Sequence, residues 1–162
     1  MNPFRSPLAA LALVAGSSLF AGDYDAMLDT VKRVLPGKTL GVVACHLEGN
    51  KAAVRELAEA AHHRGLKLRF LDIPNAGQVN AATGNLPALN AEFALIVDGD
   101  PVVGSNGSKT KTLTSAYDSL GMPSFATDEA AVKNGATLAI GAKTQGKVVS
   151  NAARVKYFRL KV

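Results

Sequence analysis

Residues 40–45 read Leu40-Gly41-Val42-Val43-Ala44-Cys45, an uninterrupted apolar run, and a helical pattern from Asn50 to Arg64 follows it. The same rhythm returns along the chain, with strand-like segments at Leu66–Ile73, Phe93–Val97, Met122–Ala126 and Ala136–Ala142. Short apolar runs that alternate with helical patterns are typical of a parallel sheet with helices on its faces. The sequence therefore predicts an α/β fold: a three-layer sandwich with a mainly parallel sheet of about five strands. A last strand at Lys147–Ser150 leaves room for an antiparallel edge.

The first 21 residues resemble a cleavable signal peptide. Arg5 is the positive charge, Leu8–Ala15 is the apolar segment, and Ala21 is the expected last residue of the leader. The apolar segment is too short for a comfortable membrane span, and a retained amphipathic anchor is the alternative. We expect mature protein to begin near Gly22 and to be periplasmic or secreted.

Removing 21 of the 162 residues leaves 141, enough for one domain with a proper core. We expect an N-terminal helix at residues 22–37 and a single α/β domain at residues 38–162. The full chain carries a formal charge of +5, and a small basic cluster lies at Lys156, Arg159 and Lys161. Such a cluster is more often a solvated chain end than a nucleic-acid site, so no nucleic-acid partner is expected.

No catalytic or metal-binding motif stands out. The chain has neither a Gly-x-Ser-x-Gly nucleophile elbow nor a His-Glu-x-x-His zinc motif. The single cysteine, Cys45, reads as a small buried hydrophobe, with a reactive thiol or a metal ligand beside His46 as the weaker alternative. We therefore expect no enzymatic activity, no metal and no cofactor; an esterase-like or phosphatase-like enzyme is a remote alternative.

Two segments after the third strand could bind a ligand. Asp98 and Asp100, two residues apart, could bind a cation or share a proton if they point the same way, but turn-forming aspartates are also common there. The glycine-rich stretch from Gly104 to Thr110 lacks P-loop spacing and is better explained as a solvated loop.

Residues 38–146 resemble the periplasmic substrate-binding proteins of one ABC transporter family. The resemblance rests on an acidic-x-Asn step after the first strand, an Asp-x-x-Val step after a middle strand and a Pro, aromatic and acidic pattern before Gly-Ala. In this sequence they are Glu48 and Asn50; Asp100 and Val103; and Met122–Asp128, Val132 and Gly135-Ala136.

That resemblance implies a flavodoxin-like lobe that recognises a small polar ligand at the carboxyl edge of the sheet, without catalysis. The cleft positions of the family fall at Glu48, Asn50, Asp100 and Asp128. Family members have two lobes and this chain has one, so a homodimer could supply the second wall. If the loop at Asp100 is exposed, Asp100→Ala should weaken binding and leave stability within about 1 kcal/mol.

A weaker resemblance links the end of the chain to YfiR-like periplasmic proteins. It rests on Gly135-Ala136 and on the segment Gly146–Ala153, which ends a strand in Asn and continues in alanines. It implies the alternative function: a periplasmic regulatory protein that restrains a membrane-associated partner enzyme.

Overall fold

The computed structural model describes residues 21–104 and 107–162. The expected leader thus lies almost entirely outside the described residues, as do residues 105–106 of the glycine-rich loop. The described strands are β1 Leu40–Cys45, β2 Lys67–Asp72, β3 Phe93–Leu95, β4 Ser124–Ala126, β5 Leu138–Ala139 and β6 Val149–Ser150. The α-helices are α1 Ala21–Val34, α2 Lys51–His63, α3 Val79–Asn85, α4 Gly107–Ser119, α5 Glu129–Lys133 and α6 Ala152–Tyr157, and short 3-10 turns lie at Glu48–Asn50, Ala76–Gln78, Leu86–Leu89 and Ala142–Thr144.

The six strands form one sheet in the order β2-β1-β3-β4-β5-β6. β1 to β5 are parallel, and β6 pairs with β5 in the antiparallel direction. The predicted fold class and the antiparallel edge are therefore confirmed, with six strands instead of about five. The last strand is shorter than its predicted span because only Val149 and Ser150 pair with β5.

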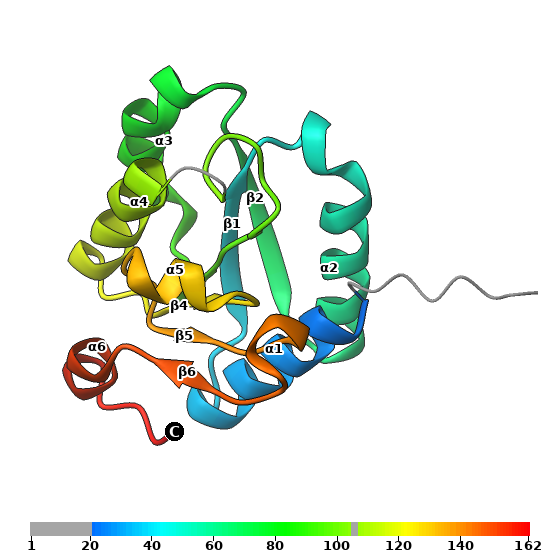
Figure 1. Cartoon of the computed structure of the whole chain (residues 1–162). Coiled ribbons are helices and arrows are strands. Elements are labelled where there is room, and N and C mark those ends of the chain that lie inside the picture. The colour runs from blue at the N-terminus through cyan, green and yellow to red at the C-terminus, as the bar shows by residue number, and fades with distance from the viewer. Residues whose placement is uncertain (1–20, 105–106) are drawn as a thin grey trace, which may run out of the picture.

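Helices cover both faces of the sheet (Figure 1). On one face α1 and α2 pack against Val43, Phe93 and Leu95 in a single apolar cluster. On the other face α3 and α4 pack against Val42 and Ala94. Successive strand residues thus serve opposite layers, as the two-residue repeat of a strand requires. Val42, Val43 and Leu95 are fully buried and Ile96 is 5% exposed, which confirms that these central positions are covered from both sides.

The N-terminal helix α1 is part of the hydrophobic core. Its stripe of Tyr24, Met27, Leu28 and Val31 is at most 5% exposed, with three of the four side chains fully buried. These residues recur at the three- and four-residue spacing of one helix face, which explains why the helix docks through them. The helix therefore packs on the domain. None of the described helices is both long and apolar enough to cross a bilayer.

Cys45 ends β1 as a buried free thiol. Burial, with smaller contributions from Asp100 and Asp72, raises the pKa of this thiol to about 12. A thiol that stays protonated is a poor nucleophile and a poor metal ligand. Among the described residues there is no group of three or more His, Cys, Asp and Glu side chains suited to a metal ion. The buried-hydrophobe interpretation of Cys45 therefore holds.

Candidate functional site at the carboxyl edge of the sheet

Three neighbouring parallel strands, β1, β3 and β4, end at the same edge of the sheet. β1 leads into the 3-10 turn Glu48–Asn50 and then α2, β3 leads into residues 96–100, and β4 leads into Thr127 and Asp128. Since ligands of open α/β sheets meet the loops at this edge, these three segments form the candidate site.

Asp100 is the internal anchor of this edge. It is fully buried, and its Oδ2 accepts hydrogen bonds from His46 N at 2.7 Å and from Asn50 Nδ2 at 2.5 Å. Its Oδ1 accepts from Val102 N and Val103 N, both at 2.7 Å. A carboxylate has about four acceptor positions, and all are used here. Asp100 is thus not exposed, so the condition under which Asp100→Ala would leave stability nearly unchanged is not met: Asp100 holds the turns after β1 and β3 together.

Asn50 stands at the N-cap position of α2 but makes no side-chain capping bond. Its amide nitrogen instead donates to His46 O at 2.8 Å and to Asp100, and only 8% of the residue is exposed. The position predicted for the helix start is therefore correct, while the side chain serves the edge of the sheet.

Asp98 reaches in a different direction from Asp100. Its Oδ2 accepts from Thr127 N at 2.6 Å, Thr127 Oγ1 at 2.7 Å and Asp128 N at 3.0 Å. Burial raises the pKa of this carboxyl above its usual value, although the hydrogen bonds from Thr127 act against the rise. Asp98 thus ties β3 to β4, whereas Asp100 ties β3 to β1. The hypothesis that the pair points the same way is wrong, because the turn closed by Asp100 N and Val97 O separates them.

Asp128 caps α5 by accepting from Ala130 N at 2.9 Å. Its other oxygen pairs with Lys143 Nζ at 2.7 Å. Burial opposes ionisation of Asp128, but Ala130 N–H and the Lys143 ammonium outweigh it, so the pKa of this carboxyl is lowered. The pair brings the loop after β5 to the same edge of the sheet.

Glu48 lies elsewhere. Its side chain is 75% exposed, pairs with Lys51 at 2.6 Å and lines a separate depression that includes Phe70 of β2. Of the four residues predicted from sequence, the structure joins Asn50 to Asp100 directly and places Asp128 at the same edge, where its backbone N donates to Asp98. It does not bring Glu48 to them.

A cavity of about 460 Å³ opens at this edge. Asn50, Asp98, Thr127 and Lys143 line it with polar groups, while α1 contributes Tyr24 and α2 contributes Ala52, Ala53 and Glu56. The volume lies within the usual range of small-molecule sites, about 300–1,000 Å³. Mixed charges on a partly apolar wall suit a small polar ligand that has an apolar portion.

Sequence reasoning missed several lining residues, among them Lys143, Tyr24 and Glu56. Lys143 follows β5, which is also a parallel strand and ends at this edge, so its place in the chain was an available signal. Tyr24 and Glu56 lie on helices. In a helix, an aromatic residue is ordinarily explained by packing in the core, and a glutamate by a solvated face. Their contribution depends on how α1 and α2 dock, which the local pattern does not encode.

Three solved structures have the same fold at low sequence identity. The ABC domain in complex with L-Trp from Streptococcus pneumonia matches with a TM-score of 0.73 and 13% identity, over 86% of this chain and 56% of that chain. A conserved domain protein from Vibrio cholerae O1 biovar El Tor has a TM-score of 0.71 and 18% identity, over 86% and 56%. A ligand-free, open substrate binding protein with adhesive properties from Clostridium difficile has a TM-score of 0.70 and 16% identity, over 84% and 55%.

This chain therefore spans little more than half the length of these structures. No curated protein matches the sequence significantly. A family model described as ABC transporter substrate binding protein matches residues 12–157, which is most of the chain. The chain belongs to the ABC transporter substrate binding protein family.

Proposed function

We propose that this chain binds a small polar ligand in the cavity at the carboxyl edge, without catalysing a reaction. The observation that carries the proposal is the cavity itself, formed where Asp98 and Asp100 hold the ends of β1, β3 and β4 in fixed positions. Membership in a family of solute-binding proteins supports a ligand-binding role. The structural neighbour in complex with L-Trp is a further support.

The cavity favours a ligand with an amino group. Asp98 and Glu56 are carboxylates, and the Asn50 amide adds a polar group on the same wall. Lys143, near the rim, is a counter-charge for an anionic group of the ligand. Tyr24, Ala52 and Val97 supply apolar surface. In this proposal Asn50 contacts the ligand, Asp100 and Asp128 position the site, and Glu48 is left out because it lines a different depression.

One lobe covers only one side of a ligand. The neighbouring structures are nearly twice as long as the part of them that this chain matches. A second wall would exclude water and add contacts, so we propose that binding is coupled to association with a second copy or with another protein. The alternative, a periplasmic regulator of a membrane-associated enzyme, rests only on the sequence resemblance that suggested it.

Export is part of the proposal. Substrate-binding proteins of ABC transporters act outside the cytoplasm, and residues 1–21 have the composition of a leader. N-terminal sequencing of the protein from its native cell should find a start near Gly22; an intact Met1 on a cytoplasmic species would contradict export.

The binding proposal is tested by a thermal-shift screen of amino acids and small amines. A ligand at about 100 times its Kd stabilises a protein by about 2.7 kcal/mol. Ala52→Trp should abolish the shift because Ala52 is exposed and lines the cavity. The matched control is Glu59→Trp, at an exposed position on the same helix outside the cavity, which should retain the shift. Equal thermal shifts in both variants would mean that the ligand binds outside this cavity. Sedimentation with and without ligand tests whether binding is coupled to association.

A further inference from the structure

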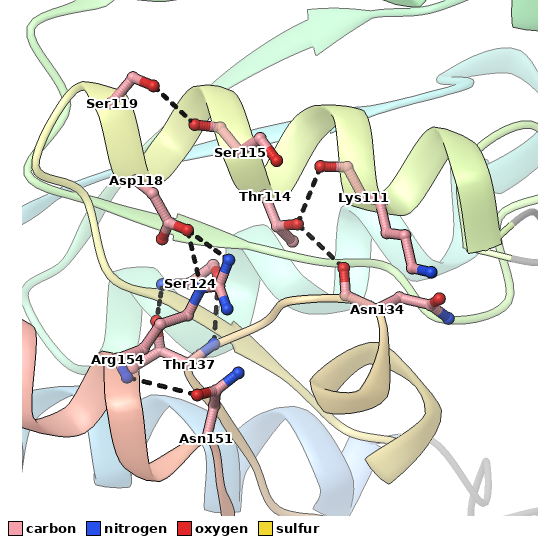
Figure 2. Close-up of polar contacts among 10 residues, drawn as sticks. All are labelled: Lys111, Thr114, Ser115, Asp118, Ser119, Ser124, Asn134, Thr137, Asn151 and Arg154. Atoms are coloured by element: carbon pink, nitrogen blue, oxygen red, sulfur yellow. Dashed lines mark hydrogen bonds and ion pairs between the residues drawn. The ribbon is translucent and has the colours of Figure 1, made fainter.

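A second hollow, of about 300 Å³, lies away from the carboxyl edge. It is bounded by α4, by the turn that precedes β5 and by the start of α6 (Figure 2). Gly135 comes before β5 and Asn151 follows the antiparallel β6, so both lie at the amino edge of the sheet. The hollow is therefore separate from the proposed ligand cavity.

The lining of this hollow is cationic. Lys111, Lys133 and Arg154 contribute to it, and none of its lining residues is a carboxylate. Lys133 pairs with Glu129 at 2.8 Å and Arg154 pairs with Asp118, but Lys111 forms no ion pair with any residue that the structure describes. Three cations face two nearby carboxylates, which leaves one positive charge unbalanced.

The surrounding sequence strengthens the positive field. Every charged residue after Glu129 is basic: Lys133, Lys143, Lys147, Arg154, Lys156, Arg159 and Lys161. Of these, Lys133 and Arg154 line the hollow, whereas Lys143 lies at the carboxyl edge with Asp128. Like charges close together in one part of a surface raise the local concentration of anions.

Arg154 is held in one orientation. Its Nε, at 2.7 Å, and its Nη2, at 2.5 Å, both contact Oδ2 of Asp118 (Figure 2). That arrangement engages one side of the guanidinium and leaves Nη1 free to donate. Asn151 accepts from Arg154 N through Oδ1 at 3.3 Å, so its amide N–H groups also remain as donors. A fixed guanidinium with neighbouring N–H donors is suited to an oxyanion.

The wall at Gly135 is kept open by the absence of a side chain. Its φ is +103°, and a Cβ there would lie 2.5 Å from Thr114 Oγ1 and 3.3 Å from Arg154 Nη2. Thr114 Oγ1 in turn contacts Asn134 O at 2.9 Å, which anchors this turn to α4 (Figure 2). Any larger residue would displace the groups that border the hollow.

We propose that this hollow is a binding site for a small oxyanion, such as a phosphate or carboxylate group, with Lys111 and Arg154 as its charged contacts. The site does not depend on the ligand cavity at the other edge. A lobe with this second site would respond to an anion in its medium or to an anionic group on a molecule that docks at α4 and α6.

Calorimetric titration of the full chain with inorganic phosphate, and separately with acetate, at constant low ionic strength tests the site. Ser115→Glu introduces a carboxylate into the hollow from an exposed position and should weaken binding by about tenfold or more. Its control, Ser119→Glu, adds the same charge one helical turn later, outside the hollow, and should retain most of the affinity.

A second pair of variants removes charge instead. Lys111→Gln should weaken binding, whereas Lys156→Gln, an equal loss of charge at an exposed position of α6, should not. If one anion binds more tightly than the other, that difference identifies the preferred group. Ala52→Trp, in the ligand cavity at the other edge, should leave anion binding unchanged. The proposal is overturned if neither anion binds at millimolar concentration, or if Ser115→Glu and Ser119→Glu bind equally well.

Discussion

The side-chain amide of Asn50 donates a hydrogen bond of 2.5 Å to Oδ2 of Asp100, across fifty positions of sequence. This contact joins the turn after β1 to the turn after β3, two neighbouring strands of the sheet. Both residues are buried, and the carboxylate receives three backbone N–H groups as well. The edge of the sheet that carries the candidate site is therefore built around one buried carboxylate.

Asp100→Ala should lower the free energy of unfolding by about 3–5 kcal/mol, because it strands three backbone donors and the Asn50 amide in a buried environment. Urea unfolding measures the loss. The control is Glu48→Ala, which removes an exposed ion pair with Lys51 and should change stability by no more than about 0.5 kcal/mol. A loss under about 1 kcal/mol at Asp100 would mean that the network contributes little.

Gly104→Ala should destabilise the protein by about 1–3 kcal/mol, since the added Cβ would lie 2.4 Å from Val97 O and 2.5 Å from Asp98 O. Neither backbone atom can move without disturbing the end of β3. Gly84→Ala provides the opposite case: Gly84 lies in α3, nothing surrounds its missing Cβ, and alanine should stabilise the helix by about 0.5–1 kcal/mol. Chemical denaturation of both variants tests the difference in sign.

Asp98→Asn should remove a pH dependence of stability. Burial raises the folded-state pKa of Asp98 above the ordinary value of 3.8, so the folded protein binds a proton more readily than the unfolded chain between the two values. The free energy of unfolding contributed by this group therefore falls as pH rises through that interval. Asparagine keeps an oxygen acceptor for Thr127 and cannot ionise.

The test is the difference in unfolding free energy between Asp98→Asn and wild type, measured at a series of pH values from 3.8 upward. The free energy of unfolding of the variant should rise relative to that of wild type as pH increases. The difference should level off above the folded-state pKa of Asp98. A flat difference for Asp98→Asn would show that its carboxyl is not perturbed by burial.

Ile96→Ala should cost about 2–5 kcal/mol, because Ile96 is 5% exposed and packs with Ala126 and Ala139 beneath α5. Leu120 has the same number of side-chain carbons but is 40% exposed, so Leu120→Ala should cost much less. Thermal and urea unfolding of the two variants compare them directly. Equal losses would mean that the end of β3 is peripheral.

The sheet was largely predictable because its signal is local. Parallel strands covered on both faces are continuous apolar runs, and Val42, Val43 and Leu95 lie in such runs. The cap at Asp128 was predictable for the same reason, since the bond to Ala130 N spans two residues. The short length of β6 was not predictable from sequence, because its pairing with β5 depends on how the chain returns across the sheet.

The site was predictable only in part because its geometry depends on contacts between distant residues. Sequence identified Asn50 and Asp100, but not that each satisfies the other. Asp98 was considered only as a partner of Asp100, although its acceptors serve Thr127, 29 residues away. Glu48 is two residues from Asn50, yet the intervening 3-10 turn directs it toward β2 and Lys51.

Within the described part of the chain, the outer strand β2 pairs only with β1, so its other edge presents backbone groups without a strand partner there. Lys67 and Arg69 are exposed on this strand, and charged side chains on an edge strand discourage another chain from adding to the sheet. The opposite edge ends in the two-residue β6, followed at once by Asn151 and α6. Both ends of the sheet are thus protected from intermolecular strand pairing, which lowers the risk of aggregation. Any association of this chain should therefore involve side-chain surfaces and loops rather than an extended sheet.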